Sequence, residues 1–384
     1  MGQSLISAGN TLKVFALNTT RHFADIGKLP EVFRRQTNIE AHKIDTSIKI
    51  IPAFLNLFSS KSYNISRFYS KEVELKLIEL LQKESFDVIQ LESLFTAPYI
   101  KAIREHSKAK IVLRAHNVEF LIWQRMRDTC KFWLKKKYLG HLAANLKKYE
   151  LKMLNKYDAI LPVTQDDADV FIKMGCSIPI LVTPVGADVS VLRTHYRENP
   201  EQCLFHLGSM DWMPNVEAIE WFLKNCLSEV SQKFPTLKMY FAGRGMPDHL
   251  KELGNKNTVF TGTVEQGQQF IQSKSIMIVP LLSGSGMRVK IVQGMAMGKA
   301  IISTTIGAGG IAYTNGKNIL IADTPDEFIA AIEKCVKDKS FCKSLGREAM
   351  KLAEEKYSNE AIGKSLNNFY KKLIAGTVTL NFKH

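Results

Sequence analysis

Short apolar runs alternate with longer amphipathic stretches along most of the chain, which has 384 residues. Apolar runs without internal alternation are typical of parallel strands buried on both faces, and the amphipathic stretches between them predict helices that cover the sheet. In the first half, the predicted strands are 12–17, 86–91, 109–115, 157–163 and 179–183, and the predicted helices are 2–8, 70–83, 94–106, 132–156 and 165–174.

The same rhythm restarts after a segment containing proline and glycine at residues 183–190. A chain of this length exceeds what one hydrophobic core usually serves. The pattern therefore predicts an α/β fold with two Rossmann-like domains that meet near residue 190. In the second half, the predicted strands are 203–208, 237–243, 257–261, 275–281, 299–304 and 318–322, and the predicted helices are 215–232, 287–298, 325–337, 340–356 and 358–373.

The beginning of the chain is unusual for a doubly wound domain. Such a domain normally opens with a strand and a glycine-rich turn. Here a predicted helix at 2–8, ended by Gly9, leads directly to the strand at 12–17. The first domain is therefore expected to lack its first strand and the loop that follows it.

Composition bounds the class of protein. Hydrophobic residues make up 45% and charged residues 23% of the chain, as in ordinary folded proteins. No apolar stretch approaches the roughly 20 residues needed to cross a bilayer. The N-terminus has neither a secretory signal nor a myristoylation motif, so a cytoplasmic protein is expected. The six cysteines are dispersed without zinc-site spacing, so we expect reduced thiols and no metal site.

The net charge of +15 points to an anionic partner, which could be nucleic acid, lipid or a phosphorylated substrate. No nucleic-acid-binding module accompanies the charge, so nucleic acid is not expected. Lysines interleave with aromatic residues at 131–138 and continue to Lys156 on one predicted helix. Such a helix suits an anionic membrane surface; the alternative is a solvated face whose lysine stems cover the core.

A glycine-rich turn between a strand and a helix predicts a phosphate site in the second domain. Glycines allow the backbone to approach a ligand, and a helix start offers free N–H groups and a positive dipole. Two cations in the first turn oppose that dipole, which indicates that a bound anion offsets them; the alternative is an ordinary turn with exposed cations. The residues are Gly284, Ser285, Gly286, Met287, Arg288 and Lys290.

Two better-known phosphate motifs are excluded. The stretch 310–318 has one residue too many for a P-loop, and Asn follows its lysine. The stretch 307–312 matches a dinucleotide fingerprint in spacing, but a turn follows it where the mechanism needs a helix. No dinucleotide cofactor is therefore expected.

Polar residues follow other predicted strands at their carboxyl ends, where open parallel sheets bind ligands. Three such residues follow the strand 109–115 and are candidates for contact with a ligand: His116, Asn117 and Glu119. The alternative is that Asn117 caps a helix. In the second domain, the candidates are Gly208, Ser209 and Arg244, with Asn215 or Asp211 as a helix cap. The Asp167–Asp169 pair is expected to lie in a first helical turn and not at a metal.

The chain resembles family 4 of the bacterial glycosyltransferases, sugar transferases of GT-B fold that build surface polysaccharides. The resemblance covers nearly the whole chain. The block most specific for this family is the last one. It consists of a glycine-rich turn, an Arg and a Lys, a helix and a second glycine-rich turn. The motifs are AHNVEF at 115–120, TPVGAD at 183–188, LGSMDWMPNVEAIEWF at 207–222, FAGRG at 241–245 and SGSGMRVKIVQGMAMGKAIISTTIGAGGI at 283–311.

The resemblance implies a retaining, metal-independent transfer from a nucleotide-diphosphate sugar to a lipid-linked or glycan acceptor. It implies two Rossmann-like domains facing across a cleft: an acceptor domain, 1–189 with a crossover helix in 358–384, and a donor domain, 190–357. Arg288, Lys290 and the amides after Gly286 would stabilise the leaving diphosphate, and His116 would face the donor sugar. No cofactor is implied. The chain would act in the cytoplasm, with the inner membrane face as a candidate location.

The sequence departs from the family pattern at two positions. Many relatives have a Glu at the position of Gln293, and that residue usually holds the nucleotide ribose. Relatives often have Glu at the position of Gly309 as well. Glutamine can donate and accept hydrogen bonds but has no charge. The alternative functions are therefore a catalytically inactive protein that binds sugar nucleotides or glycans, and a peripheral membrane scaffold.

Overall fold

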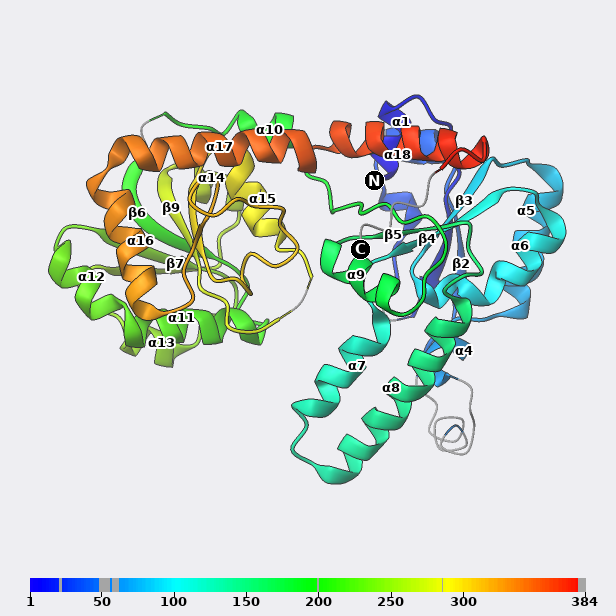
Figure 1. Ribbon diagram of the computed structural model, residues 1–384, viewed down its shortest axis with the longest axis horizontal. Helices are drawn as coiled ribbons and strands as arrows, with labels where there is room; N and C mark the ends of the chain where they lie inside the picture. Colours follow the sequence, from blue (N-terminus) through cyan, green and yellow to red (C-terminus); the bar gives the residue numbers. More distant parts are fainter. Residues whose placement is uncertain (21–22, 48–55, 57–61, 199, 285, 379–384) are drawn as a thin grey trace. The chain divides into compact units, whose positions relative to one another are not determined.

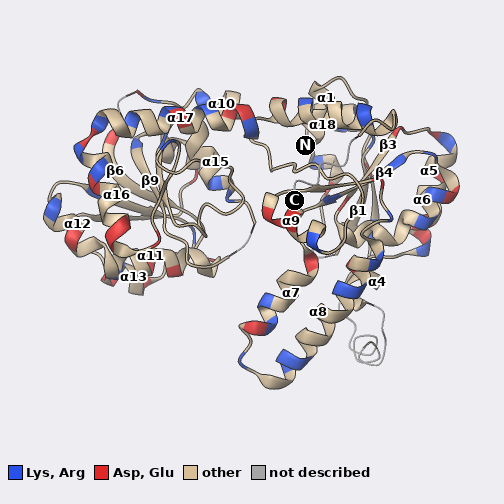
Figure 2. Cartoon of the chain, in the orientation of Figure 1, with Lys and Arg blue, Asp and Glu red and all other residues tan. Residues whose placement is uncertain are grey.

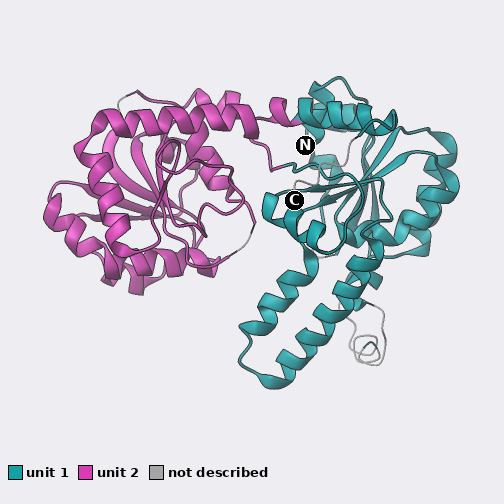
Figure 3. Cartoon of the chain, in the orientation of Figure 1, with its two compact units in different colours: residues 1–183, 363–384 teal, residues 184–362 magenta. Residues whose placement is uncertain are grey.

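The computed structural model describes residues 1–20, 23–47, 56, 62–198, 200–284 and 286–378. The chain divides into two compact units (Figure 3). Unit 1 comprises Met1–Thr183 and Gly363–His384, and unit 2 comprises Pro184–Ile362. Both are α/β units with parallel strands, so the predicted fold class is confirmed (Figure 1). In the part of the chain that the structure describes, no helix is long and apolar enough to cross a membrane.

Unit 1 contains two short parallel sheets. Strands β1 and β2 pair in parallel, with Phe15 opposite Glu40, and the second sheet has the order β3-β4-β5. The strands are β1 (Phe15–Thr19), β2 (Glu40–Ile44), β3 (Val88–Glu92), β4 (Lys110–Ala115) and β5 (Ala159–Pro162). The helices are α1 (Gly2–Ser7), η1 (Ile26–Lys28), α2 (Glu31–Thr37), α4 (Tyr63–Ser66), α5 (Lys71–Lys83), η3 (Leu94–Tyr99), α6 (Ile100–His106), α7 (Glu119–Asp128), α8 (Trp133–Met153) and α9 (Gln165–Lys173).

The opening of unit 1 follows the sequence-based prediction. Helix α1 ends before Gly9, which has a φ of 85°, and the chain then enters β1. A left-handed residue just past a helix is the usual place for glycine, because it has no Cβ to clash with the backbone.

Several predictions for unit 1 were wrong in detail. The predicted strand 179–183 forms an isolated bridge, between Ile160 and Ile180. Strand β2 was missed because its exposed positions alternate poorly and Ile44 is its one buried residue. The predicted helix 94–106 divides into η3 and α6, with Pro98 inside η3, since proline cannot donate the helical hydrogen bond.

Unit 2 is built on one parallel sheet with the order β11-β10-β9-β6-β7-β8. All its strands were predicted, while helix 215–232 divides into two helices at Cys226. The strands are β6 (Glu201–Leu207), β7 (Lys238–Ala242), β8 (Thr258–Gly262), β9 (Lys274–Val279), β10 (Ala300–Ser303) and β11 (Leu320–Ile321). The helices are α10 (Val189–Arg193), α11 (Met213–Asn225), α12 (Leu227–Lys233), α13 (Asp248–Glu252), α14 (Gly267–Gln272), α15 (Val289–Ala296), α16 (Pro325–Lys337), α17 (Lys339–Tyr357) and α18 (Asn359–Ile374).

Helices cover both faces of the unit 2 sheet, which explains the continuous apolar strands. Successive strand residues point to opposite faces. Ile276 and Ile278 pack with α11, α12 and α16, whereas Met277 and Val279 pack with α10, α15 and α17. Both faces of β9 are therefore buried, as the sequence pattern predicted.

Helix α18 joins the two units through the chain itself. It starts in unit 2 and continues into unit 1 from Gly363. A Cβ at Gly363 would lie 2.2 Å from the Ser4 carbonyl oxygen, so glycine permits the helix to pack directly on α1. Tyr370 donates a hydrogen bond to Gln90 at the end of this packing. The C-terminal helix thereby completes unit 1.

Candidate active site

The strand order of unit 2 creates a ligand-binding position at one edge of its sheet. The chain proceeds from β6 to β7 and β8 on one side, and then crosses to β9 on the other side of β6. At such a switch point the loops that follow the two central strands diverge, and the carboxyl ends of the strands border a crevice. The loops that follow β6 and β9, at 208–212 and 280–288, are those in which the sequence predicted the donor site.

Gly208 and Gly243 bring the backbones of β6 and β7 together at this edge. Gly243 has a φ of 157°, and a Cβ there would lie 1.7 Å from the carbonyl oxygen of Gly208. A Cβ at Gly208 would in turn lie 2.7 Å from the Nζ atom of Lys290. Any other residue at either position would displace the backbone or the lysine. Gly208 therefore makes room for a side chain that comes from a distant part of the chain.

The ammonium group of Lys290 is held by two side chains. Its Nζ atom donates to Oδ1 of Asn215 at 2.7 Å and lies 3.3 Å from Nε2 of His206. His206 is fully buried, and its Nδ1 atom lies 3.0 Å from the carbonyl oxygen of Ile278. Because a carbonyl oxygen can only accept, Nδ1 carries the proton and Nε2 of the neutral ring accepts from the lysine. The Nδ2 group of Asn215 donates to the carbonyl oxygen of Ser209 at 2.7 Å.

Burial makes this lysine a poorly solvated cation. Desolvation, and then the positive charge of Arg288, lower the pKa of Lys290 to about 7. Desolvation and the charge of Lys290 hold the pKa of His206 well below its ordinary value. A desolvated cation next to a second cation is stabilised by any anion that reaches it. The arrangement can therefore bind a phosphate group.

Arg288 lies under an aromatic ring at the start of α15. Its guanidinium group is 5.1 Å from the ring centre of Trp212, and Nη1 donates to the carbonyl oxygen of Gly286 at 2.9 Å. Arg288 is 6% exposed, and burial lowers its pKa. Gly284 has a φ of 112°, and a Cβ there would lie 2.8 Å from Arg288 and 3.0 Å from Trp212. The tight packing of these three residues explains why glycine occupies position 284.

The remaining residues of the predicted phosphate loop lie along α15 and the turn before it. Gly286 has a φ of 79°, which favours glycine, and Met287 packs against the core of unit 2. Ser285 lies outside the described residues. Gln293 is one turn further along α15 and is partly buried.

Arg244 and Ser209 form a small exposed network with Asp211. The Nε and Nη2 atoms of Arg244 both lie 2.7 Å from Oδ2 of Asp211, and the Ser209 hydroxyl donates to the same carboxylate at 3.0 Å. Arg244 therefore bonds to a carboxylate where the sequence predicted phosphate. The capping alternatives are wrong, because Trp212 is the N-cap residue of α11, whereas Asp211 holds Arg244 and Asn215 holds Lys290.

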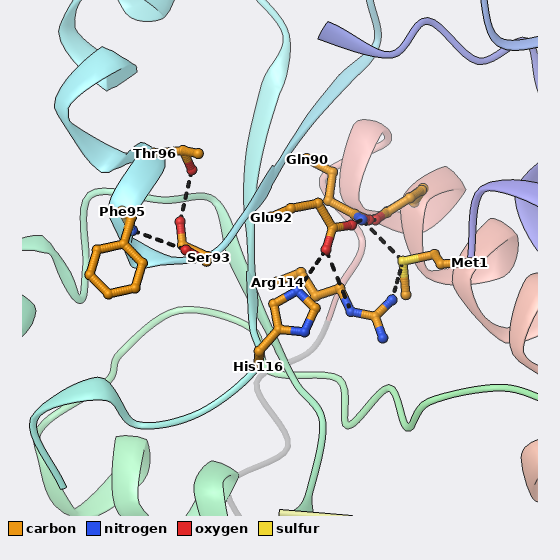
Figure 4. A network of polar contacts seen from close by, with 9 residues as sticks. Met1, Gln90, Glu92, Ser93, Phe95, Thr96, Arg114 and His116 are labelled. Atoms are coloured by element: carbon orange, nitrogen blue, oxygen red, sulfur yellow. Dashed lines mark hydrogen bonds and ion pairs between the residues drawn. The ribbon is translucent and has the colours of Figure 1, made fainter. Parts of the chain in front are cut away.

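In unit 1, His116 forms a hydrogen bond with Glu92 at the carboxyl ends of two neighbouring strands (Figure 4). Glu92 ends β3, and His116 follows β4. The Nε2 atom of His116 donates to Oε2 of Glu92 at 2.9 Å, and Nε of Arg114 lies 3.8 Å from the same oxygen. Burial raises the pKa of Glu92, but the His116 bond and the Arg114 charge outweigh it and lower the pKa overall. The carboxylate orients the imidazole ring and fixes the proton on Nε2.

Backbone strain accompanies this pair. Ser93, which follows Glu92, has a φ of 111° although it is not glycine, a conformation that costs about 1–3 kcal/mol. Its side chain accepts from the N–H of Phe95 at 3.1 Å, and its carbonyl accepts from Thr96 at 2.8 Å, as Figure 4 shows. These bonds hold the turn that ends β3. Strain of this kind is concentrated at functional sites, which supports a role for this edge.

Glu119 lies in the interior and not at the sheet edge. It is 8% exposed, and desolvation raises its pKa to about 7, with the charges of His116 and Asp167 acting in opposite directions. Glu150 accepts from the N–H groups of Glu119 and Phe120, each at 3.3 Å, and so caps α7. The N-cap residue of α7 is Val118, so the capping interpretation of Asn117 is wrong.

No group of three or more potential metal ligands was found among the residues that the structure describes. Asp167 lies in the first turn of α9 as predicted, where its carboxylate accepts from Thr164 at 2.8 Å and Thr164 caps the Asp167 N–H at 3.1 Å. The interpretation of Asp167 as a helix-terminal acid is therefore confirmed, whereas the first turn of α9 holds Asp166 and Asp167 and not Asp169.

Four contributors to the two sheet edges were missed from the sequence. They are His206, Trp212, Glu92 and Ser93. His206 has a sequence signal, since a polar residue inside an apolar strand needs a buried partner. Glu92 also has one, because it ends a predicted strand at the ligand edge. The roles of Trp212 and Ser93 depend on contacts and backbone angles that have no local signal.

Two family models match the chain. The one described as Glycosyltransferase Family 4 matches residues 3–191, and the one described as Glycosyl transferases group 1 matches residues 201–338. An uncharacterized 44.6 kDa protein in the cps region of Klebsiella pneumoniae is 24% identical over 329 residues, which cover 81% of this chain and 82% of that protein.

Solved structures share the fold at low sequence identity. Sucrose-phosphate synthase from Thermosynechococcus elongatus has a TM-score of 0.66 at 13% identity, covering 98% of this chain and 92% of that chain. HepE from Anabaena, in complex with UDP and glucose, has a TM-score of 0.57 at 14% identity, covering 94% of this chain and 99% of the HepE chain. A glycosyltransferase from Rickettsia africae has a TM-score of 0.62 at 12% identity, covering 95% and 99%. Together, the two family matches and the shared fold show that this chain is a glycosyltransferase of the family 4 type with a GT-B fold.

Proposed function

We propose that the chain is a retaining glycosyltransferase that moves a hexose from a nucleotide-diphosphate sugar to a lipid-linked or glycan acceptor in cell-surface polysaccharide synthesis. The observation that carries the proposal is the pair of buried cations, Arg288 and Lys290, at the start of α15. Two desolvated cations at a helix N-terminus repel each other and oppose the dipole, and a diphosphate removes both penalties. Such a group is the leaving group of a nucleotide-sugar transfer.

Each predicted site residue of unit 2 has a role in this proposal. Arg288 and Lys290 neutralise the diphosphate as its bond to the sugar breaks, which is the largest electrostatic contribution that a fixed site can make. The backbone after Gly284 and Gly286, including Met287, supplies N–H donors. Gln293 hydrogen-bonds the ribose. Gly208 and Ser209 lie beside the phosphates, and Arg244 has to exchange Asp211 for a phosphate to contribute.

In unit 1, His116 contacts the transferred sugar or the leaving oxygen. Nε2 of His116 donates to Glu92, which orients the imidazole ring and leaves its other nitrogen for a hydrogen bond with the sugar or the leaving oxygen. Asn117 is partly buried beside it and supplies an amide for sugar hydroxyls. Glu119 supports this edge from the interior.

The relatives support the donor class and the pathway. A structure of HepE contains UDP-glucose, so its fold binds a nucleotide-diphosphate sugar. The Klebsiella relative is a product of the cps region. We propose a similar donor and a similar biosynthetic setting for this chain, with action at the cytoplasmic face of the membrane.

Thermal-shift measurements with UDP, GDP, ADP and their common sugars test the donor site. A ligand at about one hundred times its dissociation constant stabilises by about 2.7 kcal/mol, which raises Tm by about 5–10 °C for units of this size. The Arg288→Ala/Lys290→Ala variant is expected to lose the shift, while Arg347→Ala/Lys351→Ala on α17 keeps it. Nuclear magnetic resonance of the product's anomeric proton then distinguishes retention from inversion. A folded protein that responds to no nucleotide would contradict the proposal.

A catalytically inactive binding protein is the second candidate, and Gln293 is the observation that favours it. A nucleotide-dependent thermal shift without transfer to any acceptor would support this alternative. Gln293→Glu restores the carboxylate, so a gain of transfer activity in that variant would locate the deficiency in α15.

A further inference from the structure

Helices α7 and α8 form an antiparallel hairpin that extends away from the β3-β4-β5 sheet of unit 1 (Figure 1). Helix α8 has 21 residues, so it is about 30 Å long. Its buried residues, which include Leu139, Leu142 and Leu146, start two turns after its N-terminus. The packed part of the hairpin is therefore its base, and the tip presents its side chains to the surroundings.

The tip exposes large apolar side chains. All seven residues from 131 to 137 are exposed, and three of them are Phe132, Trp133 and Leu134. Phe132 and Trp133 are each 59% exposed, and Leu134 is 51% exposed. Adjacent apolar residues of this size at the end of a projecting hairpin are not explained by the core of unit 1. A cluster of this kind marks an interaction surface.

Cations surround the apolar tip. Residues 125–156 contain ten Lys and Arg and two Asp and Glu. The net positive charge of this segment is more than half of the net charge of +15 of the whole chain. Figure 2 shows the blue segments along the hairpin. Nearly all of the excess belongs to unit 1, which carries 32 cations and 18 acids, whereas unit 2 carries 20 cations and 19 acids. The positive potential is thus concentrated where the apolar side chains are exposed.

We propose that the tip of this hairpin, residues 131–137, inserts Phe132, Trp133 and Leu134 into the interface of an anionic lipid bilayer. Aromatic and aliphatic side chains enter the boundary between head groups and acyl chains, and lysines beside them contact anionic head groups. The Nζ atom of Lys137 lies 5.2 Å from the ring centre of Trp133, so cation and ring can occupy the same interfacial layer. An acidic protein or an RNA would match the lysines but leave the three consecutive apolar side chains without an apolar environment.

This membrane contact is independent of the transfer reaction. The tip residues lie outside the residues assigned to phosphate, ribose and sugar, so the surface stands whether or not the proposed transfer occurs. Its consequence for the proposed function is that a lipid-linked acceptor would be met at the membrane surface. Nucleotide-dependent thermal shifts, measured on every tip variant, separate a failure of the membrane contact from a failure of the donor site.

Vesicle sedimentation tests the proposal with the full chain. Vesicles of phosphatidylcholine and phosphatidylglycerol at roughly three to one are expected to bind it, and phosphatidylcholine alone is not. The Lys135→Gln/Lys136→Gln/Lys137→Gln variant is expected to bind about one hundredfold more weakly, since each basic residue near the surface contributes about fivefold. The Phe132→Ser/Trp133→Ser/Leu134→Ser variant is expected to bind these vesicles more than about tenfold more weakly.

The matched control neutralises three exposed lysines of unit 2, as Lys256→Gln/Lys339→Gln/Lys356→Gln. If this control loses as much binding as the tip variants, binding follows net charge and the proposal is overturned. The proposal is also overturned if the wild-type protein does not bind anionic vesicles, or if it binds single-stranded RNA through the same tip residues and does not bind the vesicles. Circular dichroism checks that each variant is folded, which is expected because every substituted side chain is exposed.

Tryptophan fluorescence locates the inserted residue. Anionic vesicles are expected to shift the emission of the wild type to shorter wavelength, and lipids that carry a nitroxide on the acyl chain are expected to quench it. Trp133→Phe keeps an apolar ring, so it should retain vesicle binding and lose the shift. Emission changes that persist unaltered in Trp133→Phe would place the contact elsewhere and contradict insertion of the tip.

Discussion

Among single residues, Lys290 shows how a function can oppose stability. Its ammonium group is desolvated and lies near Arg288, which lowers its pKa to about 7. Asn215 and His206 are both uncharged acceptors, so they fix the position of the ammonium group without neutralising it. A carboxylate in their place would satisfy the lysine and leave less charge for a ligand. The site thus keeps its positive charge available for a phosphate.

The affinity for a nucleotide sugar is expected to fall as the pH rises through 7. Bound phosphate favours charged Lys290, so above the pKa each binding event must take up a proton. The dissociation constant should rise about tenfold between pH 6 and pH 8, measured by calorimetry with UDP-glucose or whichever nucleotide sugar binds. The phosphates of a nucleotide sugar do not titrate in this range, so the change reports on the protein.

Asn215→Asp serves as the control for this pH dependence. A carboxylate next to Lys290 raises the pKa of the ammonium group and competes with the ligand. The variant should bind more weakly at pH 6 and show a flat profile between pH 6 and pH 8. An unchanged slope in the variant would show that another group titrates.

Glu119 gives a pH dependence of stability, whereas Lys290 gives one of ligand binding. Burial raises its pKa from an ordinary 4.5 to about 7, so the folded protein holds a proton that the unfolded chain releases. The free energy of unfolding therefore falls as the pH rises from 4.5 to 7, and the loss persists above 7. Glu119→Gln should be more stable than the wild type by about 2 kcal/mol at pH 8, with little difference at pH 4.5.

Urea denaturation at the two pH values measures the effect of Glu119. The exposed Glu72 of α5 gives the control, since Glu72→Gln should cause only a small change in the unfolding free energy, of similar size at both pH values. Equal effects of the two substitutions at pH 8 would refute the buried-carboxyl explanation.

At the level of elements, the turn before α15 depends on glycine at position 284. Gly284→Ala should destabilise unit 2 by about 1–3 kcal/mol, because a Cβ would clash with Arg288 and Trp212 at a left-handed φ. The displaced guanidinium should also weaken nucleotide binding. Gly316 has a φ of 78° with open space around it, so Gly316→Ala measures the cost of the backbone conformation alone. Thermal unfolding and nucleotide titration of both variants separate the two effects.

A loss of nucleotide affinity in Gly316→Ala equal to that in Gly284→Ala would mean that crowding at the phosphate loop is unimportant.

The hairpin of α7 and α8 is the corresponding element in unit 1. Its base is packed by leucines, while the chemistry of its tip has no role in the fold. Both elements therefore separate residues that hold the structure from residues that are available to a partner.

For the whole molecule, charge and fold are distributed differently over the two units. Unit 2 is nearly neutral overall, and Arg288 and Lys290 are desolvated at the start of α15, whereas unit 1 carries the excess of positive charge. A buried cation binds one phosphate group specifically, while many exposed cations attract a charged surface. Two different anionic partners are therefore expected in the two units.

Hydrogen exchange measured by mass spectrometry is expected to resolve these partners. A bound nucleotide sugar should slow exchange in the loops 208–212 and 286–290 and leave the hairpin tip unchanged. Anionic vesicles should protect 131–137 and leave those loops unchanged. Protection of the hairpin tip by a nucleotide alone would contradict the separation of the two surfaces.

Much of the fold could be predicted from the sequence, because its physical cause is local. A strand buried on both faces is apolar along most of its length, so β4, β5, β9 and β10 are visible as apolar runs. A phosphate-binding turn needs glycines at fixed offsets from a helix start, so Gly284, Gly286 and Arg288 are recognisable in order. Strand β2 was missed because Ile44 is its one buried residue, and such a strand has no apolar run.

The sequence by itself therefore determined the alternation of strands and helices, the division into two α/β parts and the position of the glycine-rich turn before α15. Only the tertiary structure decided which residues meet there. Lys290 reaches Asn215 and His206 across 75 and 84 residues, and Glu92 reaches His116 across 24. Such pairings follow from strand order and crossovers, which depend on the packing of the whole sheet. Local periodicity specifies the elements, but the contacts between distant strand ends are made only when the sheet assembles.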